Sequence, residues 1–304
     1  MNNLHAAPEL APYHDEPAQL PSGAPGKNGV LRLGFERRGD RTILAELFRQ
    51  APLLVQRALY WDEAMPGLAC VFIVTTSGGL LQGDRHALRV RLGEHAQAHL
   101  TTQSATRIQQ MDANYATQTQ DIVLQDGAYL EFLPEPVIPY RRSRYLARTQ
   151  VSLPESATAL YAEIILPGRR YHNDGELFGY DLFSSALRVT RPDGRELFAE
   201  KFVIEPGRFP VDGCAVMGGF DVVANVVLLT SAARAERVID QIPATSTMTG
   251  PAVAGASRLP NGAGLIYRVL GTDSEPVRAV VRDFWSLVRR ETAGAPLPPP
   301  FRWR

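Results

Sequence analysis

The chain has 304 residues, 45% hydrophobic and 21% charged, which is typical of a folded globular protein. Its 32 basic and 32 acidic residues cancel, so no overall field favours nucleic acid or an anionic membrane surface as a partner. The two cysteines, Cys70 and Cys214, form neither a CxxC pair nor a disulfide framework, and we interpret them as structural thiols in a reducing compartment.

Residues 1–28 are predicted to form a disordered tail, because proline recurs at positions 8, 12, 17, 21 and 25 and acidic residues interrupt any secretory pattern. No apolar run reaches the roughly 18 residues needed to cross a bilayer. We therefore expect a cytoplasmic protein with no membrane association. Residues 29–304 are expected to form one β-rich domain that ends in a helical part and a Pro-rich tail.

From residue 30 to about residue 205 the dominant period of hydrophobicity is two, not 3.6. Runs such as LRVRL (88–92) alternate apolar and polar residues, and the 25 glycines and 23 prolines punctuate these runs at short intervals. Short alternating runs between such breaks indicate antiparallel strands. The fold class predicted is mainly β, with large antiparallel or mixed sheet layers in a helicoidal or sandwich-like arrangement.

About two helices are predicted near the C-terminus. Residues 231–242 form a short candidate that begins at a Ser cap, and residues 273–290 form a stronger one with apolar residues along one face. Between them, residues 252–271 are predicted to form two strands around the turn Pro260-Asn261-Gly262.

The segment TTSGGLLQGD (75–84) has the glycine spacing of a phosphate-binding loop. However, Asp84 stands where such a loop has lysine, no lysine lies nearby, and the following residues alternate as a strand. A nucleotide site is therefore excluded. The physical alternative is a tight connection in which glycines supply positive φ and Asp84 accepts hydrogen bonds from nearby amides.

His95 and His99 have a spacing that chelates a metal ion on a helix. Their surroundings are predicted to be a strand, where four residues separate the two rings by about 13 Å, too far to share an ion. His172, in a polar loop, is a better candidate for transient contact with a metal.

Four carboxylates lie at the ends or edges of predicted strands and could converge on one cavity: Asp84, Glu131, Glu163 and Glu176. Converging carboxylates can serve as general acid and base, relay a divalent cation, or pair with arginines. One alternative for the function is therefore a β-rich hydrolase that pairs Asp84 with Glu131 or Glu176.

Four segments, taken together and in order, resemble the UreD (or UreH) family of urease accessory proteins. They are SGGLLQGDR (77–85), LTTQSATRI (100–108), YLEFLPEPVIPY (129–140) and LPGRRYHNDGELF (166–178). The resemblance covers about residues 30 to 303. The chain departs from the family pattern at Glu135-Pro136, where members commonly read Gln-Glu, and the loop around His172 lengthens the interval before Glu176.

The resemblance implies a largely β protein without catalytic activity of its own. Such a scaffold binds apo-urease and recruits UreF, and through UreF the GTPase UreG, so that nickel reaches the dinickel site of urease. It implies no tightly bound cofactor, only nickel in transit, with an internal water-filled tunnel as the proposed route. The residues expected to form this route, or to support it structurally, are Asp84, Glu131 and Glu176, with Glu63 and His172 as further candidates.

Overall fold

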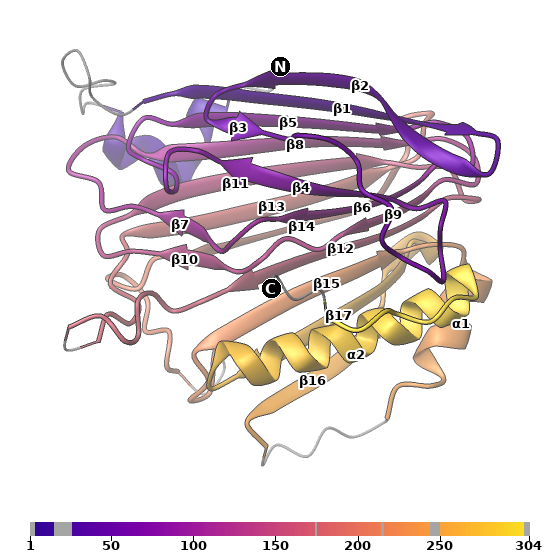
Figure 1. The fold of residues 1–304 in the computed structure, drawn as a ribbon. Coiled ribbons are helices and arrows are strands. Elements are labelled where there is room, and N and C mark those ends of the chain that lie inside the picture. Colours follow the sequence, from indigo (N-terminus) through magenta and orange to yellow (C-terminus); the bar gives the residue numbers. More distant parts are fainter. Residues whose placement is uncertain (1–3, 15–25, 174, 214–215, 244–249, 301–304) are drawn as a thin grey trace.

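The computed structural model describes residues 4–14, 26–173, 175–213, 216–243 and 250–300. Most strands belong to two mixed sheets that pack face to face (Figure 1). In order across it, the first sheet contains β14 (Glu196–Ile204), β13 (Leu182–Thr190), β11 (Arg144–Ser152), β8 (Ala116–Leu124), β5 (Arg85–Leu92), β1 (Asn28–Arg38) and β2 (Arg41–Gln50).

The second sheet faces the first along its length. In order across it, the second sheet contains β16 (Ala252–Arg258), β17 (Gly264–Gly271), β15 (Val222–Leu229), β12 (Thr158–Ile165), β9 (Tyr129–Phe132), β6 (Gln97–Thr102), β4 (Ala69–Thr75) and β3 (Leu53–Leu54). A short strand, β10 (Val137–Pro139), pairs with β12, and a second short strand, β7 (Thr106–Ile108), pairs with β10.

The mainly β class with mixed, sandwich-like layers is confirmed, but the antiparallel reading is wrong for the centre of both sheets. There, β5, β8, β11 and β13 run parallel to one another, as do β4, β6, β9 and β12. Apart from β7 and β10, the chain from β4 to β13 alternates between the sheets. Parallel neighbours need a long crossover, and here a strand of the opposite sheet provides it in place of a helix.

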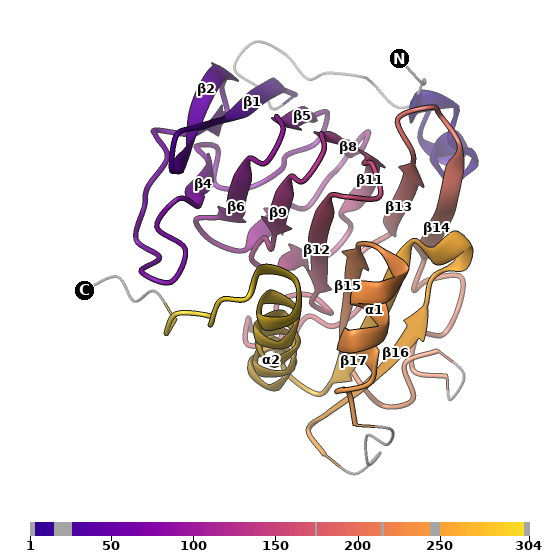
Figure 2. The ribbon, with the colours of Figure 1, turned by 90° about the vertical axis from the view of Figure 1, so that its right-hand side faces the viewer.

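The main hydrophobic core lies between the sheets, where the inward residues of each alternating run meet. In β5, for example, Leu88, Val90 and Leu92 belong to this core, as the period of two predicted. A second core lies on the outer face of the second sheet, where α2 (Ser274–Ala293) and α1 (Ala232–Ile239) cover β15 and β17 (Figure 2).

Both predicted helices are confirmed. The carboxylate of Asp273 caps α2 by accepting the amide of Ser274 at 2.6 Å, and Gly294 ends the helix with a φ of 66°. The predicted strand pair around Pro260-Asn261-Gly262 is also confirmed, as β16 and β17 joined by the 3-10 turn η3 (Pro260–Gly262).

The prediction of a disordered tail over residues 1–28 does not hold for residues 4–14. These residues form the 3-10 turns η1 (Leu4–Ala6) and η2 (Pro8–Tyr13). Leu10 is fully buried in an apolar cluster against the first sheet, and Glu9 accepts a hydrogen bond from Ser184 and pairs with Lys201. Apolar contacts of Leu4 and Leu10 and the polar contacts of Glu9 thus order a segment whose prolines indicated disorder.

Candidate functional site

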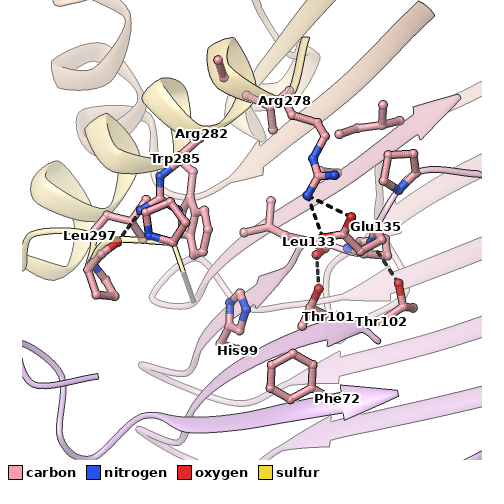
Figure 3. Close-up of a pocket in the computed structure, with 18 of the residues that line it drawn as sticks. Phe72, His99, Thr101, Thr102, Leu133, Glu135, Arg278, Arg282, Trp285 and Leu297 are labelled. Atoms are coloured by element: carbon pink, nitrogen blue, oxygen red, sulfur yellow. Dashed lines mark hydrogen bonds and ion pairs between the residues drawn. The ribbon is translucent and has the colours of Figure 1, made fainter. Parts of the chain in front are cut away.

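A groove of about 580 Å³ lies between α2 and the ends of β6, β9 and β12 (Figure 3). Its apolar wall includes Phe72, Leu133 and Trp285, and residues 297–300 of the C-terminal segment close one side. There Arg282 donates a hydrogen bond to the carbonyl of Pro298.

The groove exists because β9 is short. Beyond Phe132 the chain reads Leu133-Pro134-Glu135-Pro136, and proline has no N–H with which to continue a ladder. The threonines of the TTQ segment hold this departing chain: Thr101 Oγ1 donates to the carbonyl of Leu133 at 2.8 Å, and the amide of Glu135 donates to Thr102 Oγ1 at 2.9 Å (Figure 3). Two segments of the family resemblance therefore meet at the groove.

A buried ionic cluster fixes α2 beside the groove. Arg289 donates to both carboxylate oxygens of Glu131, from Nε and Nη2 at 2.7 Å each, and also pairs with Asp62. His99 Nδ1 lies 3.1 Å from Glu131 Oε2, and its ring stacks on Trp285. Burial alone would raise the pKa of Glu131, but hydrogen bonds from His99 and Arg289 hold it at about 2. Glu131 is therefore an ionised anchor of the helix.

Behind the groove, between the two sheets, lies a smaller cavity of about 60 Å³, the inter-sheet cavity. Groove and cavity have walls in common, since Thr102, Pro134 and Glu135 line both. At this boundary Arg278 of α2 pairs with Glu135 at 2.9 Å (Figure 3). We call Glu135 and Arg278 the outer mouth. It is built on one of the positions where this chain departs from the family pattern.

The inter-sheet cavity is mainly apolar but contains several polar side chains. His86, Gln120 and Glu163 line it, together with two tyrosines, Tyr145 and Tyr161. His86 Nε2 and Gln120 Oε1 have no hydrogen-bond partner among the described residues, although the two residues are only 3% and 6% exposed. A buried polar atom without a partner is costly, so these atoms mark positions where water or a cation is favoured.

His86 and Glu163, two of the ionisable groups that line the cavity, have pKa shifts that set their charge near neutral pH. Burial lowers the pKa of His86, against the opposing charge of Asp84, so the imidazole is neutral near pH 7 and keeps a lone pair on one nitrogen. Burial raises the pKa of Glu163 to about 7, although Ser185 donates a hydrogen bond to its Oε1 at 3.2 Å. Glu163 therefore changes charge close to neutral pH.

Asp84, at the end of the glycine-rich segment, is fully buried and holds a turn. Its Oδ1 accepts the amide of Lys27 at 2.7 Å and its Oδ2 accepts the amide of Leu81 at 2.9 Å. Gly79 of the same segment has a φ of 140°, and a Cβ there would come within 2.4 Å of the carbonyl oxygen of Arg107. The reading of TTSGGLLQGD as a tight connection braced by Asp84 is therefore confirmed.

Glu176 is also buried, and it accepts hydrogen bonds from Arg169 and from the amide of Arg141. Its contacts close the loop that follows β12. His172 lies in the same loop and lines a separate surface pocket near the start of α2, while Glu63 is exposed in the turn after β3. Their contact with nickel stays a prediction.

The four carboxylates do not converge on one cavity, and Glu131 and Glu176 instead pair with arginines, which was the other alternative. Of these four, only Glu163 lines the inter-sheet cavity, whereas Asp84, Glu131 and Glu176 each lie in contacts of their own. The hydrolase alternative loses its geometric basis, because it requires two of these three carboxylates at one site. Among the described residues, no three His, Cys, Asp or Glu side chains are grouped so that they could hold a metal ion.

Sequence reasoning missed His86 and Gln120. The signal was present, because both stand on the inward face of strands whose period of two otherwise places apolar residues in the core. A polar residue at an inward position of an alternating strand is therefore the sequence pattern that indicates a polar group in the core.

Comparison with known proteins agrees with this geometry. The family model of the UreD urease accessory protein matches residues 27–304. The chain belongs to the UreD family. It is 53% identical to the urease accessory protein UreD 2 of Brucella suis biovar 1 over 300 residues, which cover 99% of both chains. It is 48% identical to the urease accessory protein UreD of Yersinia pseudotuberculosis serotype O:1b over 298 residues, which cover 98% of this chain and 93% of that one.

Membership of the UreD family assigns the chain an accessory role in urease maturation, and with it interaction with urease and other accessory proteins. The groove, the outer mouth and the inter-sheet cavity all lie within the residues that the UreD model matches. In the part of the chain that the structure describes, no helix is long and apolar enough to span a membrane.

Proposed function

We propose that this chain is a maturation factor without catalytic activity that binds apo-urease and UreF, is joined by UreG through UreF, and passes nickel toward the urease active site through its interior. The observation that carries the proposal is the wall that the groove and the inter-sheet cavity share at Thr102, Pro134 and Glu135. We infer that a small cation passes from the groove into the cavity across this wall.

The side chains of the inter-sheet cavity suit a divalent cation in transit. The neutral imidazole of His86, the amide oxygen of Gln120 and the carboxylate of Glu163 line the cavity and are ligands of the right kind for Ni²⁺.

These ligands favour transit over retention. Cysteine thiolates would hold Ni²⁺ tightly, whereas the cavity wall offers only oxygen and imidazole groups. Because the pKa of Glu163 is about 7, a proton and the cation can replace one another at its carboxyl group. The carboxyl group loses its proton as the cation arrives and regains it as the cation leaves. Near neutral pH neither form is strongly favoured, so neither step is costly.

The groove serves in this proposal as the outer vestibule. The Glu135 carboxylate is shared between vestibule and cavity, and Arg278 shields it until a cation competes for it. Because the outer mouth joins α2 to the loop after β9, a partner that binds on α2 can change how readily it opens.

The experiment is a pull-down of the chain with apo-urease and UreF, followed by metal analysis of urease matured with and without the chain. The proposal predicts a complex that contains all three proteins, and urease that lacks nickel when the chain is omitted. Fully nickel-loaded, active urease in its absence would overturn the scaffold role.

A further inference from the structure

The interior continues beyond the inter-sheet cavity. A chamber of about 20 Å³, which we call the side chamber, shares Tyr161 and Glu163 with that cavity. Its other polar members, Ser185, Glu200 and Asn225, come from β13, β14 and β15. A volume of this size holds about one water molecule, and so it has room for one metal ion without its waters.

A row of polar side chains leads from this chamber toward the edge of the second sheet. The strand register places Glu163 beside Asn225, and Asn225 beside Arg268. Since neighbouring strands lie about 4.8 Å apart, the row advances roughly 10 Å from β12 to β17.

An ion pair closes the far end of the row. Arg268 of the second sheet pairs with Glu200 of β14, the edge strand of the first sheet. The Arg268 side chain is 57% exposed, while that of Glu200 is 24% exposed and lines the side chamber. The outer mouth has the same construction, with an exposed arginine, Arg278, over a glutamate, Glu135, that lines the interior.

We propose that Glu200 and Arg268 form a second mouth, so that a divalent cation entering from the groove leaves through the side chamber between β14 and β17. An exposed Arg–Glu pair contributes little to stability, so Arg268 can turn into solvent while Glu200 takes the cation as an oxygen ligand. Nickel as the cargo rests on the function proposed above. The second mouth itself rests on the lining residues, the register and the ion pair.

The test measures access to the side chamber and needs neither nickel nor urease. Ser185→Cys places a thiol in the chamber with little change in volume, and a small reagent, methyl methanethiosulfonate, modifies it at a rate read by mass spectrometry of its peptide. The rate is compared in four further backgrounds: Arg268→Ala, Glu200→Gln, Arg278→Ala at the outer mouth and, as the matched control, Arg258→Ala. The control breaks an exposed Arg–Glu pair, with Glu236, that closes neither cavity nor chamber.

We expect modification of the thiol to rise by up to about fivefold in Arg268→Ala and Glu200→Gln, because the ion pair no longer has to break before the mouth opens, and to stay unchanged in Arg258→Ala. Equal rates in all backgrounds would overturn the second mouth, as would acceleration by Arg278→Ala alone. Thermal melting of each variant verifies that all are folded. If access rises but urease nickel content is the same in every variant, the second mouth stands and the nickel route fails.

Discussion

Arg289 of α2 and Glu131 of β9 form a two-point ion pair inside the protein, with Nε–Oε1 and Nη2–Oε2 distances of 2.7 Å each. The two residues are 158 positions apart in the chain. The pair joins the C-terminal helix to the centre of the second sheet, and so it sets one wall of the groove.

Replacing Arg289 with Met should destabilise the fold strongly. The change leaves the buried carboxylates of Glu131 and Asp62 without their cation, a loss of about 3–5 kcal/mol in similar buried pairs. Chemical denaturation measures the free energy of unfolding. The matched control is Arg290→Met, the next residue of the helix, which is exposed and should change that free energy little.

The same cluster makes the free energy of unfolding depend on pH in the acidic range. The pKa of Glu131 is about 2 in the folded protein, below its ordinary value of 4.5, so its ionised form favours folding. The contribution is fully present above pH 4.5 and is lost as pH falls from 4.5 toward 2; a shift of this size corresponds to about 3 kcal/mol. Glu131→Gln should remove this slope from a plot of unfolding free energy against pH, and an unchanged slope would refute the assignment.

Glu163 should show the opposite sign. Its pKa of about 7 lies above its ordinary value of 4.5, so the folded protein favours the protonated form. Ionisation therefore opposes folding increasingly as pH rises from 4.5 to 7, and fully above 7. Glu163→Gln should stabilise the protein by about 3 kcal/mol at pH 8 and by much less at pH 4.5. The exposed Glu155→Gln serves as control and should show no such difference between the two pH values.

Gly79→Ala should disrupt the turn that Asp84 braces. The φ of 140° is strained for alanine, and the added methyl would come within 2.4 Å of the Arg107 carbonyl oxygen. We expect a loss of at least about 2 kcal/mol in unfolding free energy. Gly207→Ala is the control, since a methyl group there meets no atom within 4 Å. Equal stability of the two variants would show that the segment tolerates a side chain.

Local patterns in the sequence account for the strands, the helices and the glycine-rich turn. The period of two around Leu88 and the helical pattern over residues 273–290 depend only on neighbours along the chain, and both were predicted. The parallel pairing was not, because its crossovers are themselves strands of the other sheet and leave no helical pattern to read.

The site was predicted less well, for the same physical reason. The sequence identified Asp84, Glu131 and Glu176 as notable, and the structure explains each by a partner far along the chain or in a loop. The sequence could not show which carboxylate faces the interior, because that depends on how β12 packs against β13. In the structure, the contact between Glu163 and Ser185 shows that Glu163 is that carboxylate.

The most direct test of the nickel route is the nickel content per active site of urease matured with the Glu163→Gln variant. We expect the complex with urease to assemble normally but its nickel content to fall severalfold, because among the described residues the cavity then keeps no carboxylate except that of the outer mouth, while Glu155→Gln gives full loading. Full loading with Glu163→Gln, in complexes of normal composition, would contradict passage of nickel through the inter-sheet cavity.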